Sequence, residues 1–321
     1  MLTTLRAHPV VLAVVAAGVA ALCYLLVLAA GHRAGGGHPR PASPANVFPS
    51  ALTTGVPKGT TLLAVPGQVS HGPGWYFDPR GFVQVDGDGA VLSGLYIPYN
   101  LDITGSDVTI RDVRVVAGGP NVIGISLRHT SDVTIKDCTT SGRDTRAGRL
   151  MAGIKDVFGD SASTMILRDD ISMFESGVQL ETGLIQGSYI HDPGYLPGDH
   201  TNGVTSNGGG TRRLTITGNT ILVDRAQTDA IGLFEDFGGQ QNRIITGNLL
   251  AGGGYTVYAG QNPGGPPSRD IVITGNQISS RYYPRGGFYG CVTDIGMRKY
   301  GNIWSENTWN TQGTAAFSRC N

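Results

Sequence analysis

The sequence predicts an all-β fold, a single-stranded right-handed parallel β-helix in which the chain winds through stacked coils. The first observation is a six-residue motif that returns with almost the same spelling, as LTITGN at 214–219, RIITGN at 243–248 and IVITGN at 271–276. The closing asparagines of these copies are 29 and then 28 residues apart. A period in this range, with one β-branched run and one turn-forming residue in each repeat, is typical of a solenoid.

Looser copies of the motif extend the series in both directions. The segments between the copies are too short for a βαβ unit with a real helix, and none of them shows apolar residues at helical spacing. We therefore expect about eight to ten coils. The looser copies are VTIRD ending at Asp112, VTIKD at Asp137, MILRD at Asp169, GLIQGS at Ser188 and NIWSEN at Asn307.

A second column of short apolar runs supports the same fold. Each run begins at a small residue, as in GISLR from Gly124 and GIKDV from Gly153, and its second residue is always Ile or Val. Side chains alternate along a strand, so these residues are expected inside the coil and the third and fifth positions outside it. Asp156 and Asp294 break the pattern at the fourth position, so either the register shifts there or the alignment is off by one. The expected outward side chains are Ser126, Arg128, Lys155, Gln179, Glu181, Thr205, Asn207, Phe234 and Tyr258.

The chain divides into a short tail at 1–8, an apolar span at 9–31, a Gly/Pro-rich linker at 32–59 and the β-helix domain at 60–321. The apolar span has no charge across 23 positions, which is long enough to cross a bilayer as a transmembrane helix. Its exit, LAA at 28–30, lacks the small-x-small pattern of a cleavage site, so a signal anchor is favoured over a cleaved signal peptide. We therefore expect the β-helix outside the cytoplasm, anchored to the membrane, or secreted if the span is cleaved.

Residues 60–105 alternate short apolar runs with turns and are expected to form the first coils and a cap over the open end of the core. The acidic turn VDGDGA at 85–90 lacks the regular acidic spacing of a calcium loop, so we interpret it as a plain turn. The sequence establishes no cofactor, and a requirement for Ca²⁺ stays open.

The net charge and the cysteines indicate which binding partners and which cellular compartment fit the sequence. The formal net charge is zero and no basic run is present, which argues against nucleic acid as a partner. A disulfide between Cys291 and Cys320 is one possibility outside the cytoplasm, and it would leave Cys138 as a buried free thiol. The sequence predicts no particular oligomeric state.

The longest polar insertion between two repeats, YIHDPGYLPGDHTNGVTSNGGG at 189–210, carries most of the candidate functional groups. The next repeat enters its equivalent strand through QTDAIGLFED at 227–236, which aligns Asp229 with Asn202. Coils of a β-helix stack ~4.8 Å apart, so their outward side chains form one polar groove, a shape that suits a linear polymer. Acids, bases and a tyrosine in such a groove suit acid–base chemistry on sugars. The candidate catalytic residues are His200, Asp229, Tyr258 and Lys155, and the candidate substrate-binding residues are Glu181, Asn202, Asn207, His191, Phe234 and Glu235.

Structural roles for the same residues stay open at this point. The repeated asparagines are interpreted as a turn ladder whose amides hydrogen-bond from coil to coil. His191 is equally well placed to shape the turn that follows it, and Asp229 and Glu235 to be solvated turn charges. Lys155 could pair with Glu181 on a neighbouring coil, and the two aromatic candidates could either pack on the surface or stack on a sugar ring.

The VTIRD and ITGN repeats, followed by strands that begin with Gly-Ile or Gly-Val, resemble the pectate-lyase-like superfamily of right-handed parallel β-helices over about residues 60–321. The block GDHTNGVTSNGG followed by QTDAIGLFED is similar to a group of secreted or anchored bacterial β-helix proteins of uncharacterised activity. The superfamily contains lyases, hydrolases, epimerases and non-catalytic binding proteins, so the resemblance implies a fold more sharply than an activity. Some relatives carry His-x-Asp-Gly where this chain has HTNG at 200–203, and the asparagine removes a charge that could bind calcium or act as an acid.

Together these observations imply a polysaccharide lyase or epimerase that acts on an acidic glycan. Such chemistry needs a base, a group that neutralises the uronate carboxylate and an acid for the leaving oxygen. The alternatives are a non-catalytic glycan-binding or cell-surface structural protein and a polygalacturonase-like hydrolase, which would need several clustered aspartates on adjacent coils. The expected roles are His200 as base, Asn202 with Asn207 or Lys155 at the carboxylate, and Tyr258 or Asp229 as the proton partner.

Overall fold

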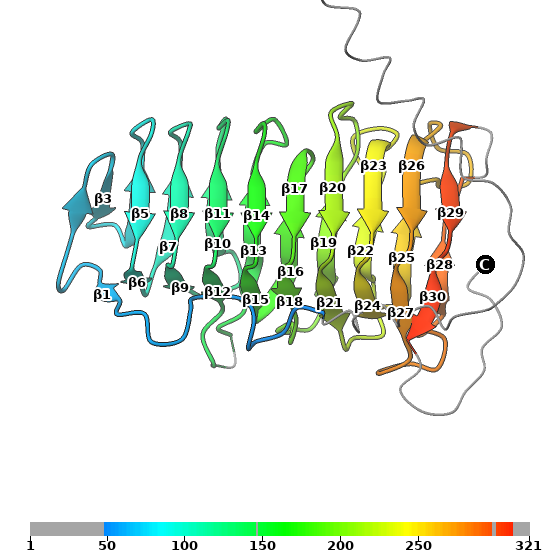
Figure 1. Ribbon diagram of the computed structural model, residues 1–321, viewed down its shortest axis with the longest axis horizontal. Helices are drawn as coiled ribbons and strands as arrows, with labels where there is room; N and C mark the ends of the chain where they lie inside the picture. The colour runs from blue at the N-terminus through cyan, green and yellow to red at the C-terminus, as the bar shows by residue number, and fades with distance from the viewer. Residues whose placement is uncertain (1–47, 146, 297–299, 311–321) are drawn as a thin grey trace, which may run out of the picture. The chain divides into compact units, whose positions relative to one another are not determined.

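The computed structural model describes residues 48–145, 147–296 and 300–310. This part of the chain forms a parallel β-solenoid of the right-handed type with about nine turns (Figure 1), so the predicted all-β fold is confirmed. It consists of strands and turns, and within the described ranges there is no helix that could span a bilayer. The apolar span 9–31 and most of the predicted linker lie outside the described residues.

The coils wind through three sheets, and nearly all neighbouring strands in them are parallel. Sheet A contains, in order, β1 (Leu63–Ala64), β6 (Leu95–Ile97), β9 (Arg114–Val116), β12 (Thr139–Ser141), β15 (Asp170–Ser172), β18 (Tyr189–Ile190), β21 (Thr220–Val223), β24 (Leu249–Gly252), β27 (Gln277–Ser279) and β30 (Thr308–Asn310). Sheet B contains β2 (His71–Gly72), β3 (Trp75–Asp78), β4 (Phe82–Val85), β7 (Asn100–Ile103), β10 (Ile123–Leu127), β13 (Leu150–Asp156), β16 (Phe174–Gln179), β19 (Asn202–Ser206), β22 (Asp229–Leu233), β25 (Tyr255–Ala259) and β28 (Gly290–Thr293). Sheet C contains β5 (Val91–Ser93), β8 (Thr109–Arg111), β11 (Thr134–Lys136), β14 (Met165–Leu167), β17 (Gly183–Gln186), β20 (Leu214–Thr217), β23 (Gln241–Thr246), β26 (Arg269–Thr274) and β29 (Ile303–Ser305).

The turn from sheet C into sheet A explains why the ITGN motif repeats. Gly218, Gly247 and Gly275 have φ angles of 63°, 65° and 65°, a left-handed conformation that glycine adopts without a steric cost. The asparagine after each glycine is buried and joins a ladder, in which Asn219 Nδ2 donates to Asn248 Oδ1 at 2.9 Å. The predicted turn ladder of stacked amides is therefore confirmed.

At Asp112 and Asp137 the predicted alignment of this turn is wrong by one residue, whereas Asp169 and Ser188 occupy the ladder position as predicted. Asp112 and Asp137 have φ angles of 54° and 53° and occupy the left-handed position, which is the place of Gly218 in the later coils. The ladder position is the next residue, Cys138, whose backbone N–H donates to Asp169 Oδ1 at 2.7 Å. Aspartate tolerates the left-handed region better than most residues, so it can stand where the later coils use glycine.

The predicted inward column of sheet B is confirmed. The register pairs Ile125 with Ile154 and Ile154 with Val178, and these side chains are fully buried. Asp156 is paired in register with a fully buried leucine of β10, so no shift occurs at that position. Its carboxylate accepts hydrogen bonds from the backbone N–H and the hydroxyl of Ser161 at 3.1 and 3.0 Å, which satisfy an inward-facing acid.

The first end of the solenoid departs from the parallel pattern. β3 pairs antiparallel with both β2 and β4, and β4 then pairs parallel with β7. Figure 1 shows β3 at the blue end of the fold. Val65 and Trp75 join the hydrophobic core there, as expected of a cap over the first coils.

Residues 48–59, at the end of the predicted linker, lie against the solenoid. The backbone N–H of Gly55 donates to the carbonyl of Arg168 at 2.8 Å, and the N–H of Val56 donates to Thr139 Oγ1 at 3.1 Å. Gly55 has a φ of 76°, and a Cβ atom there would lie 2.7 Å from Thr139 Oγ1, so glycine suits this close approach. The folded unit therefore includes residues upstream of position 60.

Two of the cysteines in the predicted domain lie in the described part of the chain. Cys138 is a buried free thiol, as predicted. Cys291 is disulfide-bonded, and Cys320, the partner that the sequence suggests, lies outside the described residues.

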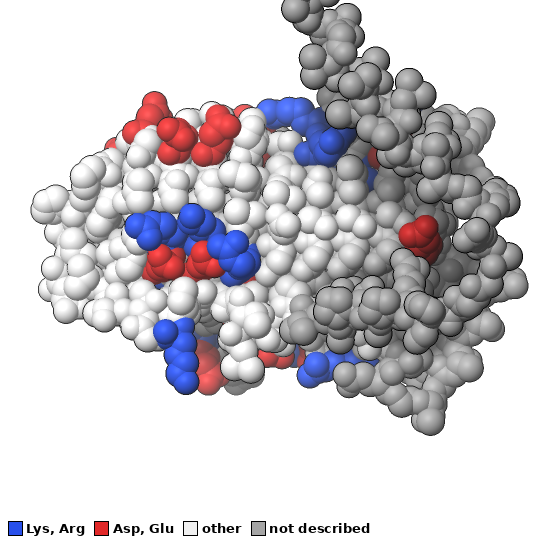
Figure 2. Space-filling model, in the orientation of Figure 1, with Lys and Arg blue, Asp and Glu red and all other residues white. Residues whose placement is uncertain are grey.

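The face that carries sheet C shows charge in small clusters (Figure 2). Arg111 pairs with Asp112 at 3.2 Å, and Arg168 pairs with Asp137 at 2.7 Å. Positive and negative side chains accordingly lie side by side near β8, β11 and β14, and much of the remaining visible face is uncharged. The charges of these pairs are therefore balanced on the protein itself.

Candidate functional site

Two adjoining cavities form a groove along the outer face of sheet B, over β13, β16, β19 and β22. The cavities have volumes of about 360 and about 320 Å³, and Gln179 and Asn207 line both of them. We call the combined feature the sheet B groove. Its wall includes six of the ten predicted site residues, namely Lys155, Glu181, His200, Asn202, Asn207 and Phe234. The outward column predicted from the sequence therefore does bring most of these side chains together.

Lys155 gives the groove an unpaired cation. It lies on β13 in register with Gln179 of β16 and is half-buried. Burial lowers the pKa of Lys155, and the nearby Glu175 carboxylate opposes that shift only in part. Glu175 instead pairs with Arg149 at 3.0 Å, and within the described residues the side chain of Lys155 has no hydrogen bond or ion pair. Because the Lys155 amine lacks a partner, it is available to pair with the carboxylate of a ligand.

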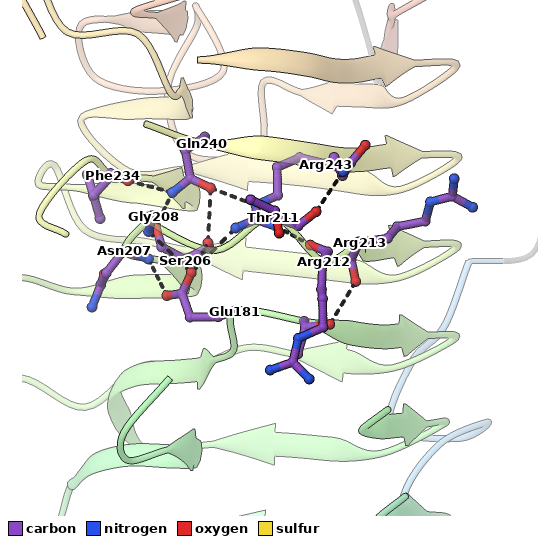
Figure 3. A network of polar contacts seen from close by, with 12 residues as sticks. Glu181, Ser206, Asn207, Gly208, Thr211, Arg212, Arg213, Phe234, Gln240 and Arg243 are labelled. Carbon is purple, nitrogen blue, oxygen red and sulfur yellow. Dashed lines mark hydrogen bonds and ion pairs between the residues drawn. The ribbon is translucent and has the colours of Figure 1, made fainter. Parts of the chain in front are cut away.

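Glu181 is part of the groove wall, but its oxygens are already in use (Figure 3). They accept hydrogen bonds from the hydroxyl of Ser206 at 2.7 Å and from the backbone N–H groups of Asn207 and Gly208 at 2.5 and 3.2 Å. Arg243, which is fully buried, lies 3.4 Å from the same carboxylate. Glu181 therefore fastens the loop after β19, and the suggested pair with Lys155 does not form.

A glutamine on the next coil completes this network. Gln240 donates to the carbonyl of Ser206 at 2.8 Å and accepts from Arg243 Nε at 2.6 Å. Arg243 also donates to the carbonyl of Arg212 at 2.9 Å, as Figure 3 shows. The loop from Asn207 to Arg213 is thus held by side chains of the preceding and the following coil, which fix the wall on this side of the groove.

His200 lies at the other side of the groove, immediately before β19. The preceding residue, Asp199, is held by the buried Arg149, whose Nε donates to the Asp199 carboxylate at 2.7 Å and whose Nη2 donates to the other oxygen. The same carboxylate accepts from the backbone N–H of Leu196 at 2.6 Å. The ring of His200 is exposed, with Nδ1 3.4 Å from Gln227 Nε2. The backbone next to His200 is therefore fixed, and its imidazole is accessible to a ligand in the groove.

Asn202 and Thr205 supply uncommitted oxygen atoms to the groove. Asn202 Nδ2 donates to the carbonyl of His200 at 2.7 Å and to Ser176 Oγ at 3.3 Å. Its Oδ1 and the hydroxyl of Thr205 are buried and have no hydrogen-bond partner among the described residues. Buried polar atoms are normally paired, so these two atoms are suited to receive hydrogen bonds from a bound ligand.

Asp229 and Tyr258 lie at the downstream end of the groove rather than in its wall. Asp229 is paired in register with Asn202, as the sequence predicts, but its side chain is fully buried. Burial raises the pKa of Asp229 well above its usual value. The ring of Tyr258 lies 5.7 Å from the ring of Phe234, and burial followed by the nearby Asp229 raises its pKa.

The other two predicted site residues lie away from the groove. His191 follows β18 on the sheet A side, where its ring nitrogens lie 3.1 Å from Asp170 and 2.7 Å from Asp192. Burial lowers the pKa of His191, but the hydrogen bonds with these carboxylates outweigh it and leave the pKa raised. Glu235 accepts hydrogen bonds from Ser268 Oγ at 2.9 Å and from the N–H of Asn262 at 3.1 Å, so it ties together neighbouring loops.

A separate cavity of about 460 Å³ lies over sheet A, with Phe48, Tyr189, Thr220 and Arg281 in its wall. It offers hydroxyl and aromatic groups, but the nearest imidazole, His191, stacks on Tyr189 and has both nitrogens engaged. This cavity is therefore less suited to proton transfer than the sheet B groove. In the described ranges no group of three or more His, Cys, Asp or Glu side chains is arranged to hold a metal ion.

No protein-family model matches the chain, and no curated protein matches it. The chemistry open to the groove depends on the side chains that line it. They include one unpaired cation, one exposed imidazole, two uncommitted buried oxygen atoms, the exposed carboxylate of Asp236 and three phenylalanine rings. This set can bind an anionic, hydroxyl-rich ligand and can move a proton.

Proposed function

We propose that the sheet B groove binds an acidic glycan and that the protein is a polysaccharide lyase or epimerase of the pectate-lyase-like superfamily, acting outside the cytoplasm. The observation that carries this proposal is the unpaired, half-buried Lys155 in a groove that also holds the exposed imidazole of His200. The groove follows the stack of coils, so successive sugar units of a linear polymer can meet equivalent positions on successive strands.

In this proposal Lys155 neutralises the carboxylate of one uronate unit, which makes the proton on the adjacent carbon easier to remove. His200, in its neutral form, takes that proton as the general base. In a lyase, the electron pair left on the carbon forms a C=C bond and the bond to the glycosidic oxygen breaks, so that oxygen must receive a proton. In an epimerase, a proton returns to the same carbon from the opposite face and the chain stays intact.

The test is to incubate the full chain with polygalacturonate, alginate and hyaluronan, and to follow chain length, unsaturation and uronate configuration by NMR. A lyase produces shorter, unsaturated chains, and an epimerase changes configuration at constant length. We expect Lys155→Gln to weaken binding and also to lower turnover, because the uronate carboxylate is no longer neutralised. Lys136→Gln, on the outside of sheet C, is the matched control and should leave activity unchanged. If none of the polymers is altered or bound, the proposal fails.

A non-catalytic glycan-binding protein is the second candidate. The observation that favours it is that three carboxylates predicted for the site are not free to act on a ligand. Glu181 and Glu235 are hydrogen-bonded within the protein, and Asp229 is buried. Such a protein would bind one of the polymers through the same groove and return it with unchanged length and configuration. A hydrolase of the polygalacturonase kind would need paired carboxylates, and here Asn202 lies opposite Asp229.

A further inference from the structure

Asp229 is a buried carboxyl group on the outer side of sheet B, next to the sheet B groove. Its outward placement follows from Gly232, which occupies the register position of Thr205 and Tyr258 on the neighbouring strands. A Cβ atom on Gly232 would lie 2.6 Å from Asp229 Oδ2 and 2.6 Å from the ring of Phe234. The carboxyl and the edge of the ring therefore share the space that a side chain fills in the adjacent coils.

The Phe234 ring separates this carboxyl from the groove. The second cavity is lined by Asn202, Thr228 and Phe234, among others. Asp229 lies between Thr228 and Phe234 in the sequence but does not line the cavity. Asp229 is 0% exposed. Displacement of the ring would therefore open the groove onto the carboxyl.

Neither oxygen of Asp229 has a hydrogen-bond partner among the described residues. A buried polar group without a partner is costly, and an asparagine or a leucine at this position would avoid burying an acid. The coil on one side presents the neutral Asn202, and the coil on the other presents the phenol of Tyr258, so no cation compensates the carboxyl. An uncompensated acid beside a groove indicates a functional role.

We propose that Asp229 is the acid of the sheet B groove and that the Phe234 ring covers it until a bound glycan displaces the ring. This inference rests on the proposed function for the identity of the ligand. Once uncovered, the carboxyl donates its proton to the glycosidic oxygen as the bond from that oxygen to the sugar carbon breaks, and Asp229 becomes a carboxylate. The proton that His200 has removed passes to solvent, and Asp229 takes one up from solvent after the product leaves, so protons balance over one turnover.

The first test needs no ligand. The full chain is labelled with ¹³C at the aspartate carboxyl carbons, and the Asp229 signal is assigned by its loss in Asp229→Asn. We expect this carboxyl to titrate at a higher pH than an ordinary aspartate, to shift toward the ordinary value in Phe234→Ala, and to stay in place in Phe234→Leu, which keeps an apolar cover. An ordinary titration in the wild type overturns the inference, as does a Phe234→Ala titration equal to that of the wild type.

The second test adds polygalacturonate or alginate oligosaccharides. Binding should move the Asp229 carboxyl signal, and Asp229→Asn should lower turnover on the order of a hundredfold while binding is retained. If the glycan saturates the protein without moving that signal, Asp229 is not part of the site and the inference is overturned. If no uronate polymer binds the wild type, the proposed function fails, and the ligand-free titration alone decides whether Asp229 is a covered acid.

Discussion

Asn248 is held by its side chain on both sides of its coil. Its Oδ1 accepts from the backbone N–H and the Nδ2 of Asn219, both at 2.9 Å, and its Nδ2 donates to the carbonyl of Ile216 and to Asn276 Oδ1, also at 2.9 Å. Alanine would remove these bonds and leave buried groups unpaired. We expect Asn248→Ala to lower the free energy of unfolding by about 2–4 kcal/mol, measured by chemical denaturation.

The control for this prediction is Asn307→Ala, at the end of the described ladder. Asn307 is only partly buried, so water can replace some of its hydrogen bonds. The loss of stability should be clearly smaller than for Asn248→Ala. Equal losses in the two variants would contradict a ladder whose strength comes from burial.

His200 should behave in the opposite way. Its ring is exposed and makes one long contact with Gln227, so His200→Ala should change the free energy of unfolding by less than about 0.5 kcal/mol. Glycan turnover should be lost, because the general base is removed. A melting curve and a product assay on the same preparation check both parts. Early melting with retained turnover would mean that His200 belongs to the scaffold.

We expect the stability of the folded protein to depend on pH through His191. Its pKa is raised in the folded protein, so it binds a proton more tightly there than in the unfolded chain. Its stabilising contribution is therefore complete below the ordinary histidine pKa of ~6.5 and is lost as the pH rises through the folded value. His191→Gln should destabilise the protein on the acid side of this window and have little effect on the alkaline side. An effect that is independent of pH would contradict the pairing with Asp170.

The positions of single residues could be predicted from the sequence where the same residue type recurs from coil to coil. The inward Ile or Val of sheet B recurs from run to run, and the ladder asparagine recurs in the ITGN copies, so their positions follow from the period there. The burial of Asp229 was not predictable, because it depends on Gly232 and Phe234 filling the same space on its outer side. Alignment with Asn202 indicated the correct strand position but not that a ring covers the acid.

At the scale of elements, the segment before β19 depends on one buried arginine. Arg149 immediately precedes β13 and reaches Asp199 through two hydrogen bonds, and Asp199 in turn holds Leu196. We expect Arg149→Lys to loosen residues 193–199, because an ammonium group does not reproduce the two-pronged contact of a guanidinium. Hydrogen exchange should become faster at the Leu196 amide, and glycan affinity should fall because His200 follows this segment.

Arg143→Lys provides the matched control, since Arg143 makes an exposed contact with the carbonyl of Pro98 at 2.9 Å. It should leave both the exchange rate and the affinity unchanged. Unchanged exchange at Leu196 in Arg149→Lys would show that the segment is held by other contacts.

The elements were predictable where local patterns decide them, and the loops were not. Strands of sheet B follow from alternating side chains, as in β13 and β16. The hydrogen-bond network that holds the loop after β19 joins Glu181 to Arg243. These residues are 62 positions apart in the chain, so no local pattern reveals the network. Arg149 was missed for the same reason, because Asp199 lies 50 residues away.

For the whole molecule, the period of the ITGN motif was enough to predict the stacked coils. It could not predict that residues 48–59 lie against sheet A, because their composition is that of a linker and the contact uses backbone groups. Nor could it predict the shape of the two cavities that form the sheet B groove, which depends on loops of different lengths.

We expect the ligand to lie in the sheet B groove, and its position in a crystal structure tests this most directly. Crystals of the protein soaked with uronate oligosaccharides should show a sugar chain along β13, β16, β19 and β22, with a carboxylate at Lys155 and with Phe234 moved away from Asp229. An oligosaccharide seated instead in the cavity over sheet A, beside Tyr189 and Arg281, with the groove empty, would contradict the account.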